Sequence, residues 1–267
     1  MILREYGISD SLYRRIGRKF IPLFSKRMLR FELDQPIISI SFDDFPKSVM
    51  ENALPLLDKY GWKASFYVAS GLVNTTNHLG LHFNQNDLAR LQQGGHEIGC
   101  HTYNHLNITE ISTSRLTDEL KANARAAKNL GITTPLRAFA YPFGETSISR
   151  KAKLSHEFSS LRGIMRGVHY GKVDLNQIKS VPIYTGPDMA QTHRFIKNLT
   201  RKPGWLTLFT HDVRENPSEW GCTPQDFEKT LALIHESGAK VMPIQKTVDF
   251  LAEAHGKNTK SNLRDMT

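Results

Sequence analysis

Two pairs of polar residues in this chain could bind a metal ion together. Asp43 and Asp44 close an apolar run that begins near residue 36, and His101 and His105 follow a second apolar run later in the chain. One carboxylate and two imidazoles suit a divalent ion such as Zn²⁺ and leave coordination positions open. The other carboxylate would lie beside the metal, where it could take a proton from a bound water. The pattern therefore predicts metal-assisted hydrolysis.

Each part of this pattern also has an ordinary structural explanation. An Asp-Asp pair after a strand often forms a turn or caps the next helix. The chain has 11 histidines, so a His-x-x-x-His pair can arise by chance. The two pairs occur in order, each after an apolar β-type run, and this joint occurrence favours the metal site.

Four motifs resemble those of the NodB-homology polysaccharide deacetylases (carbohydrate esterase family four). The run Ile37–Asp44 matches the first motif, and His101–His105 matches the second, His-Ser/Thr-x-x-His. The loop Tyr141–Gly144 is similar to the third motif, and Leu206–His211 matches the last, an apolar strand that ends in His. The motifs keep the family order between about residues 36 and 250.

The resemblance implies a role for each matched side chain. The metal ligands would be Asp44, His101 and His105. Zn²⁺ is the first choice of ion, and Co²⁺, Ni²⁺ and Fe²⁺ tolerate the same donors. Asp43 would act as the general base and His211 as the general acid that protonates the leaving amine. On its own, His211 could instead be a strand-end histidine that caps the turn with Asp212.

Aromatic residues near the motifs are candidates for the oxyanion and the sugar. The backbone N–H of Phe143 would help to stabilise an oxyanion, with an ordinary aromatic-Pro turn as the alternative. Tyr141 and Tyr103 are further candidates for substrate contact, and Tyr184 and Trp220 could stack on sugar rings. A single aromatic residue is more often a packing residue.

Two departures from the family pattern leave roles open. Where the third motif often has an Arg that orients the catalytic Asp, this chain has Ala140. The candidate replacements are Arg137, Arg162 and Arg166, and spacing does not choose among them. The Asp-x-Trp motif is not visible near Val181–Tyr184, and Asp188 is a candidate for its Asp. The Ala-Tyr-Pro-Phe-Gly form resembles a subgroup that acts on bacterial exopolysaccharides, including poly-N-acetylglucosamine and holdfast glycans.

The alternation of strands and helices predicts the α/β class, with a single distorted (β/α) barrel of about seven parallel strands. Strands are expected near 36–42, 64–69, 96–101, 136–140, 160–165, 180–184, 205–210 and 240–243. Helices are expected near 49–60, 86–93, 114–130, 146–156, 190–200, 224–237 and 244–255. The candidate catalytic residues follow strands, at the rim where such barrels build active sites. The domains would be a basic arm (1–35), the barrel (36–256) and a polar tail (257–267).

Composition narrows the function classes. The net charge of +9, from 35 basic and 26 acidic residues, suits nucleic acid, anionic lipid or an acidic glycan. No nucleic-acid-binding signature accompanies it, so we expect no nucleic acid partner. No run approaches the roughly twenty apolar residues of a membrane span. Cys100 and Cys222 do not suggest a disulfide framework, and Cys100 is expected to be a buried thiol.

The basic arm leaves two explanations open. Residues 13–30 interleave basic and bulky apolar side chains, as in segments that lie on anionic membranes. The arm could instead pack across the barrel floor, and Pro22 would interrupt any continuous helix. Residues 1–35 show no signal peptide, so we expect a location in the cytoplasm or on the inner face of its membrane.

We therefore expect a deacetylase that removes N-acetyl groups from N-acetylhexosamine units of a bacterial polysaccharide or lipid-linked oligosaccharide. A small-molecule amidase on the same barrel and a non-catalytic glycan-binding scaffold are the alternatives. A base and an acid on either side of a metal argue against the scaffold. An open cleft would favour a polymer, and a closed pocket would favour a small amide. The sequence gives no expectation for the oligomeric state.

Overall fold

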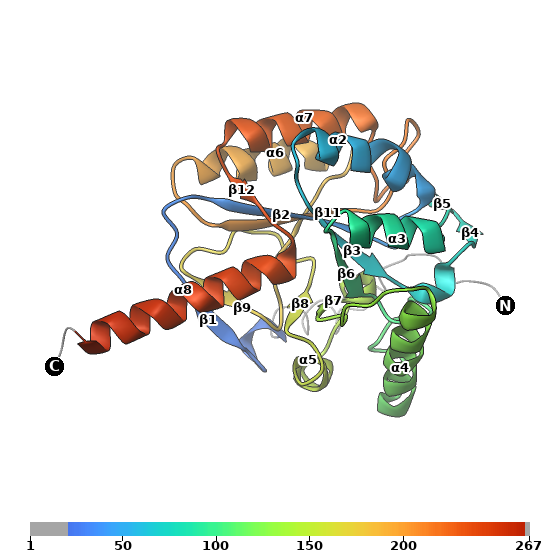
Figure 1. The fold of residues 1–267 in the computed structure, drawn as a ribbon, viewed down its shortest axis with the longest axis horizontal. Helices are drawn as coiled ribbons and strands as arrows, with labels where there is room; N and C mark the ends of the chain where they lie inside the picture. The colour runs from blue at the N-terminus through green and yellow to red at the C-terminus, as the bar shows by residue number, and fades with distance from the viewer. Residues whose placement is uncertain (1–20, 265–267) are drawn as a thin grey trace.

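The computed structural model describes residues 21–264, and it describes side chains as far as residue 254. Its centre is a curled sheet of parallel strands in the order β10-β11-β2-β3-β6-β7-β8, with β12 also paired to β2 (Figure 1). The strands are β2 (Ile37–Asp43), β3 (Ser65–Val68), β6 (Glu97–Cys100), β7 (Ala138–Ala140), β8 (Ser160–Arg162), β10 (Val181–Pro182), β11 (Trp205–Thr210) and β12 (Lys240–Val241). The predicted barrel of parallel strands is confirmed.

The two ends of the sheet meet through an irregular seam. Ile178, shortly before β10, forms an isolated parallel bridge with Arg162 at the end of β8. The Ile178 N–H donates to the Leu161 carbonyl at 2.8 Å, and the Gly163 N–H donates to the Ile178 carbonyl at 2.9 Å. Because β10 then pairs with β11, residues 178–182 connect the last strand of the curl to the first. This seam is the distortion in the barrel.

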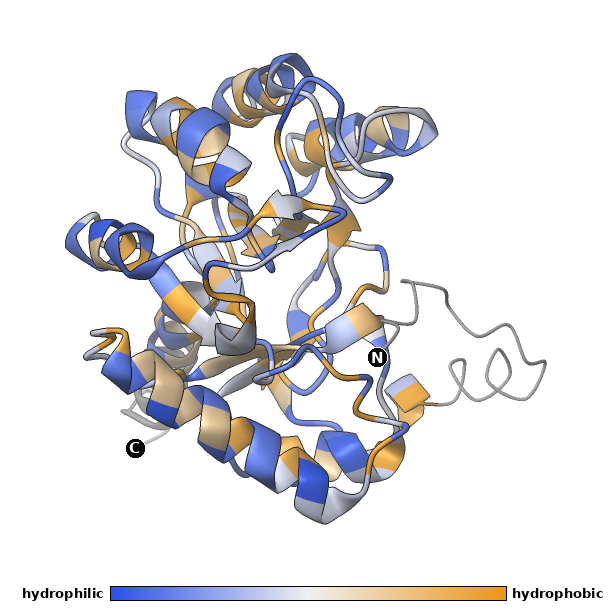
Figure 2. Cartoon of the chain, turned by 90° about the vertical axis from the view of Figure 1, so that its right-hand side faces the viewer, coloured by the Kyte–Doolittle hydropathy of each residue, from blue (hydrophilic) through white to orange (hydrophobic). Residues whose placement is uncertain are grey.

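Helices lie around the outside of the sheet and carry both apolar and polar residues (Figure 2), and most of their buried residues are apolar. They are η2, a short π-helix (Val49–Ala53), α2 (Leu54–Lys59), α3 (Gln85–Gln93), α4 (Thr113–Asn129), α5 (Ile148–Ser155), α6 (Pro187–Leu199), α7 (Pro224–Glu236) and α8 (Ile244–Arg264). Side-chain caps fix several starts: Ser112 caps α4, Ser147 caps α5 and Thr223 caps α7. Helix α8 continues to Arg264, beyond its expected end near residue 255. No helix within 21–264 has both the length and the apolar character needed to cross a bilayer.

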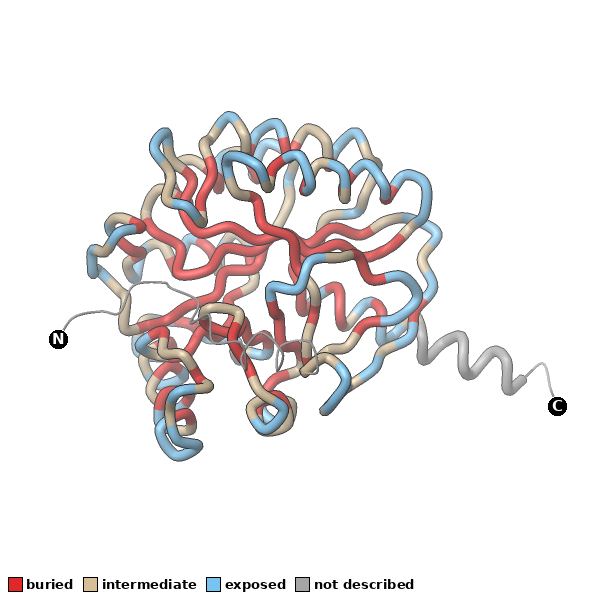
Figure 3. The backbone as a smooth tube through the Cα atoms, turned by 180° about the vertical axis from the view of Figure 1, so that it is seen from behind, coloured by how far each residue is buried: buried red, intermediate tan, exposed pale blue. Residues whose placement is uncertain are grey.

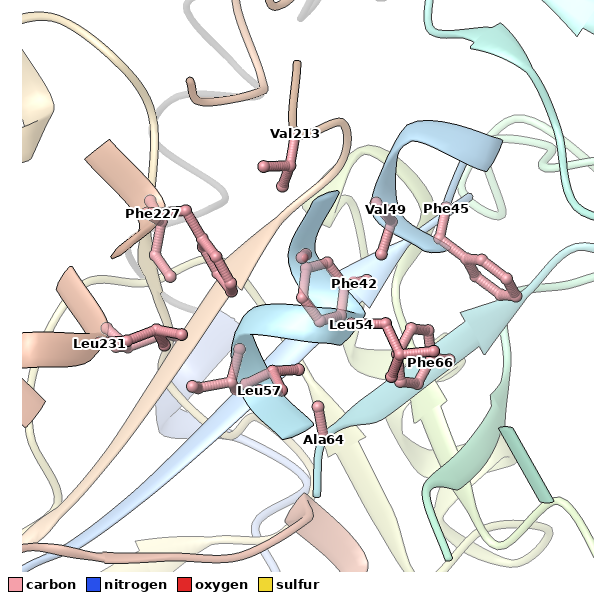
Figure 4. Close-up of a cluster of buried hydrophobic side chains, with 14 of the residues drawn as sticks. Phe42, Phe45, Val49, Leu54, Leu57, Ala64, Phe66, Val213, Phe227 and Leu231 are labelled. Atoms are coloured by element: carbon pink, nitrogen blue, oxygen red, sulfur yellow. The ribbon is translucent and has the colours of Figure 1, made fainter. Parts of the chain in front are cut away.

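Strand β2 is buried along its whole length, at the centre of the molecule (Figure 3). Its alternate residues Ile38, Ile40 and Phe42 join the main hydrophobic cluster. There Phe42 stacks on Phe66, with ring centroids 5.0 Å apart, beside residues of α2 and α7 (Figure 4). A strand buried on both sides is held in register by its packing. The position of Asp43 and Asp44 at its end is therefore fixed.

Several short elements were not predicted. Strand β1 (Met28–Arg30) pairs antiparallel with β9 (Lys172–Asp174), and β4 (Thr76–Asn77) forms a hairpin with β5 (Gly80–Leu81). Single 3₁₀ turns occur at η1 (Ile21–Leu23), η3 (Ser70–Leu72) and η4 (Pro142–Gly144). Both cysteines are buried free thiols, as expected.

The described part of the basic arm is anchored to the barrel. Arg27 donates to the carbonyls of Ser155 and Phe158 at 3.0 and 2.9 Å. The buried Lys151 ammonium donates to the Phe24 carbonyl and to Asp174, both at 3.0 Å. Residues 21–30 therefore pack against α5 and β9. The first part of the predicted basic segment, residues 13–20, lies outside the described residues.

Candidate active site

The three predicted metal ligands lie together at the carboxyl end of the sheet. Asp44 directly follows β2, and His101 directly follows β6. Asp44, His101 and His105 are buried, and each offers one ligand atom within 4.8 Å of the other two. His105 Nε2 lies 3.2 Å from Asp44 Oδ2. The ends of parallel strands meet at one edge, which is why residues so far apart in the sequence converge here.

The donor chemistry of this cluster fits a divalent ion. His101 Nδ1 lies 2.8 Å from the Ala140 carbonyl, and a carbonyl can only accept, so Nε2 is left as the unprotonated nitrogen. Burial lowers the pKa of His101 to about 4 and that of His105 to about 3, so both imidazoles are neutral at pH 7. A carboxylate and neutral imidazoles are the forms that bind such metals. Asp44, His101 and His105 are the residues that would hold the ion.

The backbone around this cluster is strained. Asp44, Thr102, His105 and Phe143 all have φ between 52° and 62°, a region that non-glycine residues rarely adopt. They are four of the six non-glycine residues with positive φ in the described chain. Such conformations cost about 1–3 kcal/mol each and persist where the surrounding structure enforces them. Backbone outliers of this kind tend to cluster at functional sites, and four of them lie around the predicted metal ligands.

Neighbouring side chains enforce these conformations, and the sequence did not reveal them. His82 is fully buried, and its Nδ1 lies 2.5 Å from the Asp44 carbonyl. The Glu119 carboxylate, also buried, accepts from the backbone N–H of Asn104 at 2.8 Å. Glu119 is on α4, so that helix fixes the loop between the two histidine ligands.

Arg162 is the arginine that reaches the predicted base. Its guanidinium, fully buried at the end of β8, donates to Asp43 Oδ2. Of the other two candidates, Arg137 binds Asp249 at 2.8 Å, and Arg166 pairs with Asp188 at 2.7 Å. Burial alone would raise the pKa of Asp43, but Arg162, His101 and His211 together outweigh it and lower that pKa. The structure therefore makes the choice that spacing could not.

His211 follows β11 and lies across the site from the metal ligands. Its Nδ1 is 3.1 Å from the Trp220 carbonyl, so this nitrogen carries the proton and Nε2 remains available. Asp212 also holds this turn, because it accepts from the Ser218 N–H at 2.9 Å and pairs with Arg214 at 2.8 Å. His211 therefore contacts the turn through Nδ1, as the alternative explanation expected, and this contact leaves its Nε2 open to a catalytic role.

Four of the predicted site residues, Asp43, His101, His105 and His211, line one pocket with a volume of about 240 Å³. Its lining residues are Asp43, His101, His105, Tyr141, Phe143, Gly144, Ile164, Arg166, Pro182, Tyr184, Phe209, His211 and Trp220. Asp188, the candidate for the missing fourth-motif Asp, pairs with the lining residue Arg166.

The structure places some of the predicted aromatic residues in the pocket wall and others away from it. Phe143, Tyr184 and Trp220 line the pocket, and the Phe143 ring centroid is 4.5 Å from that of His105. Tyr141 also lines it, but its hydroxyl donates to the Asn176 carbonyl at 2.8 Å and its side chain is buried. Tyr103 is half-buried and is not one of the lining residues. Phe143, Tyr184 and Trp220 are therefore the better candidates for sugar contact.

Comparison with known proteins agrees with this geometry. Residues 31–157 match the model of the family described as "Polysaccharide deacetylase". Just under half of the chain is therefore similar to this family. The matched residues include both Asp residues, both predicted ligand histidines and the third motif, whereas Arg162 and His211 lie beyond them. The fold brings these two residues to the site that the matched residues form.

Two curated proteins are similar to part of this chain. A bifunctional xylanase/deacetylase from Pseudobutyrivibrio xylanivorans is 30% identical over 96 residues, which are 36% of this chain and 15% of that protein. The uncharacterized protein YlxY from Bacillus subtilis is 27% identical over 113 residues, 42% of this chain and 32% of that protein. The chain therefore spans less than two thirds of the length of either relative.

Solved structures share the fold of this chain at low identity. Peptidoglycan deacetylase PdaC from Bacillus subtilis has a TM-score of 0.57 at 15% identity, covering 87% of this chain and 98% of that one. The Xyl-CE4 domain of a xylanase from the hindgut metagenome of Trinervitermes trinervoides has a TM-score of 0.55 at 17% identity, and the match covers 84% of this chain and 92% of that one. A CE4 family pseudoenzyme from Bacillus anthracis has a TM-score of 0.56 at 17% identity, and the match covers 85% of this chain and 68% of that one. At these identities the comparison shows the fold alone.

Proposed function

We propose that the chain is a metal-dependent hydrolase that removes N-acetyl groups from N-acetylhexosamine units of a bacterial polysaccharide or lipid-linked oligosaccharide. The observation that carries this proposal is the buried Asp43–Arg162 pair beside the Asp44–His101–His105 cluster. It supplies an ionised carboxylate next to three metal donors. A bound divalent ion would supply Lewis acidity and lower the pKa of water.

Asp43 would serve as the general base. Arg162 occupies Asp43 Oδ2, while the buried Oδ1 has no hydrogen-bond partner. The oxygen Oδ1 is therefore the atom that would take the proton of the attacking water. Because the pKa of Asp43 is lowered overall, its carboxylate is ionised and ready at neutral pH.

His211 would serve as the general acid. In amide hydrolysis the water oxygen bonds to the acetyl carbon, the C–N bond breaks, and the amine leaves with a proton. The cationic form of His211 carries a proton on each ring nitrogen, and with Nδ1–H held by the Trp220 carbonyl, Nε2–H would deliver its proton to the leaving amine. The backbone N–H of Phe143, in the strained turn that lines the pocket, would donate to the oxyanion.

The pocket supports a sugar substrate through its walls. Tyr184 and Trp220 offer aromatic surfaces beside the catalytic groups, and aromatic faces suit the apolar faces of sugar rings. The third-motif sequence, with Ala140 before Tyr141, supports an exopolysaccharide such as poly-N-acetylglucosamine over chitin. A location in the cytoplasm or on the inner face of its membrane stays a prediction.

The first test is acetate release from N-acetylglucosamine oligomers. It would compare metal-loaded protein, chelated protein and Asp43→Asn, with metal content measured on each. The matched control is Asp249→Asn, another ion-paired carboxylate that pairs with Arg137. We expect release that needs both the metal and Asp43 and that survives in the control.

Two other outcomes would contradict the proposal. Metal binding without acetate release from any oligomer would favour the small-molecule amidase or the scaffold. Equal release from chelated and loaded protein would remove the metal from the mechanism.

A further inference from the structure

Exposed apolar side chains gather beside the pocket mouth. Leu23, Phe24, Ile148, Ile164 and Met165 form what we call the rim surface, and each is exposed over 38–57% of its area. They are five of the nine large hydrophobic residues exposed in the described chain. Because water-exposed apolar side chains of this size are usually scattered, a local group of them marks a contact surface.

Hydrogen bonds show that the residues of the rim surface lie close together. Ser25, which follows Phe24, donates to the Ile148 carbonyl at 3.3 Å. The Ser25 carbonyl in turn accepts from Asn176 at 2.7 Å. The next residue, Gln177, donates to Met165 Sδ at 3.5 Å. These contacts link the chain segments around residues 24, 148, 165 and 176.

The rim surface is continuous with the pocket. Ile164 belongs to both, since it also lines the pocket. Its side chain covers the third-motif turn so closely that a Cβ on Gly144 would lie 2.3 Å from Ile164 Cγ1. Whatever covers the rim surface therefore lies at the entrance to the catalytic residues.

The segments that carry the rim surface are rich in basic residues. These segments, residues 21–30, 143–150, 163–167 and 176–179, contain one acidic residue, Glu145, which is buried. Their basic residues are Lys26, Arg27, Arg30, Arg150, Arg166 and Lys179. Some of this charge is paired within the protein, as in the Arg166–Asp188 ion pair. Arg27 directs its guanidinium to backbone carbonyls, and the remaining basic residues still outnumber the acidic one, which matches an anionic partner.

We propose that the rim surface contacts an anionic lipid bilayer. Bulky apolar side chains interleaved with basic residues are the composition that binds the interface of anionic membranes. A polyanionic glycan would be attracted by the same charge, but it would gain little from exposed leucine, phenylalanine and isoleucine. Bilayer contact would hold the pocket mouth at the membrane surface. If the proposed deacetylase function holds, the substrate class is then a glycan carried on a lipid.

The test is co-sedimentation of the full chain with phospholipid vesicles. Vesicles with equal parts of phosphatidylglycerol and phosphatidylcholine would be compared with vesicles of phosphatidylcholine alone. We expect binding to the anionic vesicles, and binding at least about tenfold weaker for Leu23→Ser combined with Phe24→Ser. The matched control is Phe250→Ser, which alters an equally apolar residue on α8 that is 38% exposed. It should bind like the unaltered chain.

Several results would overturn the proposal. The first is that the unaltered chain does not bind anionic vesicles. The second is that the double variant binds them as well as the unaltered chain, and the third is that Phe250→Ser loses as much vesicle binding as the double variant. A polyanionic polysaccharide that binds and loses affinity in the same double variant would assign the surface to a glycan instead. Acetate release from a short soluble oligomer and the melting temperature should stay unchanged in the double variant, which guards against misfolding. Asp43→Asn should still bind vesicles, so a failure of membrane binding is separable from a failure of catalysis.

Discussion

At the scale of single residues, the Asp43–Arg162 pair governs both the candidate chemistry and the stability of the site. Arg162→Met leaves the Asp43 carboxylate buried without its partner, which costs about 3–5 kcal/mol in comparable cases. We expect that loss in urea unfolding, together with a loss of at least about 100-fold in acetate release. The measurements are denaturant titration and initial rates on the same preparations.

A double variant separates the charge from the packing. Adding Asp43→Asn to Arg162→Met removes the unpaired carboxylate, so the double variant should be more stable than Arg162→Met alone. Arg137→Met is the matched control, because it breaks the exposed pair with Asp249 and should cost no more than about 1 kcal/mol. If the two single arginine variants lose equal stability, the Asp43–Arg162 pair does not have this role.

The site residues that could be predicted are those whose spacing is local. Asp43 and Asp44 adjoin, and His101 and His105 share one loop, so the sequence displays both pairs directly. Arg162 could not be chosen, because its contact depends on the curl of the sheet. It reaches from β8 across the barrel interior, where its guanidinium lies 4.8 Å from the centroid of Phe209. The spacing of apolar and polar residues along the sequence does not reveal a contact between side chains so far apart in the chain.

At the scale of elements, the β4–β5 hairpin positions His82, the residue that contacts the backbone of Asp44. His82 directly follows the hairpin and hydrogen-bonds the Asp44 carbonyl through Nδ1. We expect His82→Ala to weaken Zn²⁺ affinity by about 10–100-fold, because Asp44 loses the partner that supports its left-handed backbone. Competition with a metal indicator would measure it. His82→Gln, whose amide can donate, should recover part of the affinity.

A buried histidine elsewhere provides the comparison for His82. His169 is also buried, and it accepts from the Lys179 N–H at 3.0 Å, away from the ligand cluster. His169→Ala should leave Zn²⁺ affinity unchanged even if it lowers stability. Equal losses of affinity in the two alanine variants would show that His82 has no specific effect on the ligand.

The attachment of α8 makes stability depend on pH. Burial raises the pKa of Glu97 from its usual value of 4.5 to about 7, and its Oε2 accepts from the Gln245 N–H in the first turn of α8 at 2.7 Å. The folded state therefore binds the proton more tightly than the unfolded state. Protonation of Glu97 therefore stabilises the folded state fully below pH 4.5, and this stabilisation is lost as the pH rises to about 7. We expect the free energy of unfolding to fall by up to about 3 kcal/mol across this range.

Glu97→Gln should flatten that pH dependence, because the amide stays neutral and its oxygen can still accept from Gln245. Urea titrations at pH 4.5, 6 and 8 would measure the effect. Glu228→Gln, which alters an exposed pair with Lys59, is the control and should retain the dependence of the unaltered chain. A slope that survives in Glu97→Gln would assign the dependence to another group.

Most strands and helices could be predicted because their patterns are strong. The parallel strands are apolar runs followed by capped amphipathic helices, and each was expected within a few residues of its position. The pair of β1 with β9 escaped prediction, because each strand has only three residues and the two are far apart in the chain. The extension of α8 escaped because its last turns are polar.

At the scale of the whole molecule, the curled sheet converts distant motifs into one site. The ligand cluster uses the ends of β2 and β6, the base is paired from β8, and the acid comes from β11. Residues 178–182 close the curl and so set the distance across the pocket between β8 and β11. The fold class could be predicted from alternation alone, whereas this irregular seam could not, since its short strands carry no pattern.

The same convergence predicts that metal binding stabilises the entire fold. A ligand that binds only the folded chain adds about 2.7 kcal/mol at a concentration 100-fold above its Kd. For a chain of 267 residues that corresponds to a rise of roughly 5–10 °C in the melting temperature. We expect Zn²⁺ to raise Tm by this amount, chelation to reverse it, and Asp44→Asn to abolish it. Asp249→Asn leaves the cluster intact and should keep the full rise in Tm. If Zn²⁺ does not change the Tm of the unaltered chain, then Asp44, His101 and His105 do not hold the ion.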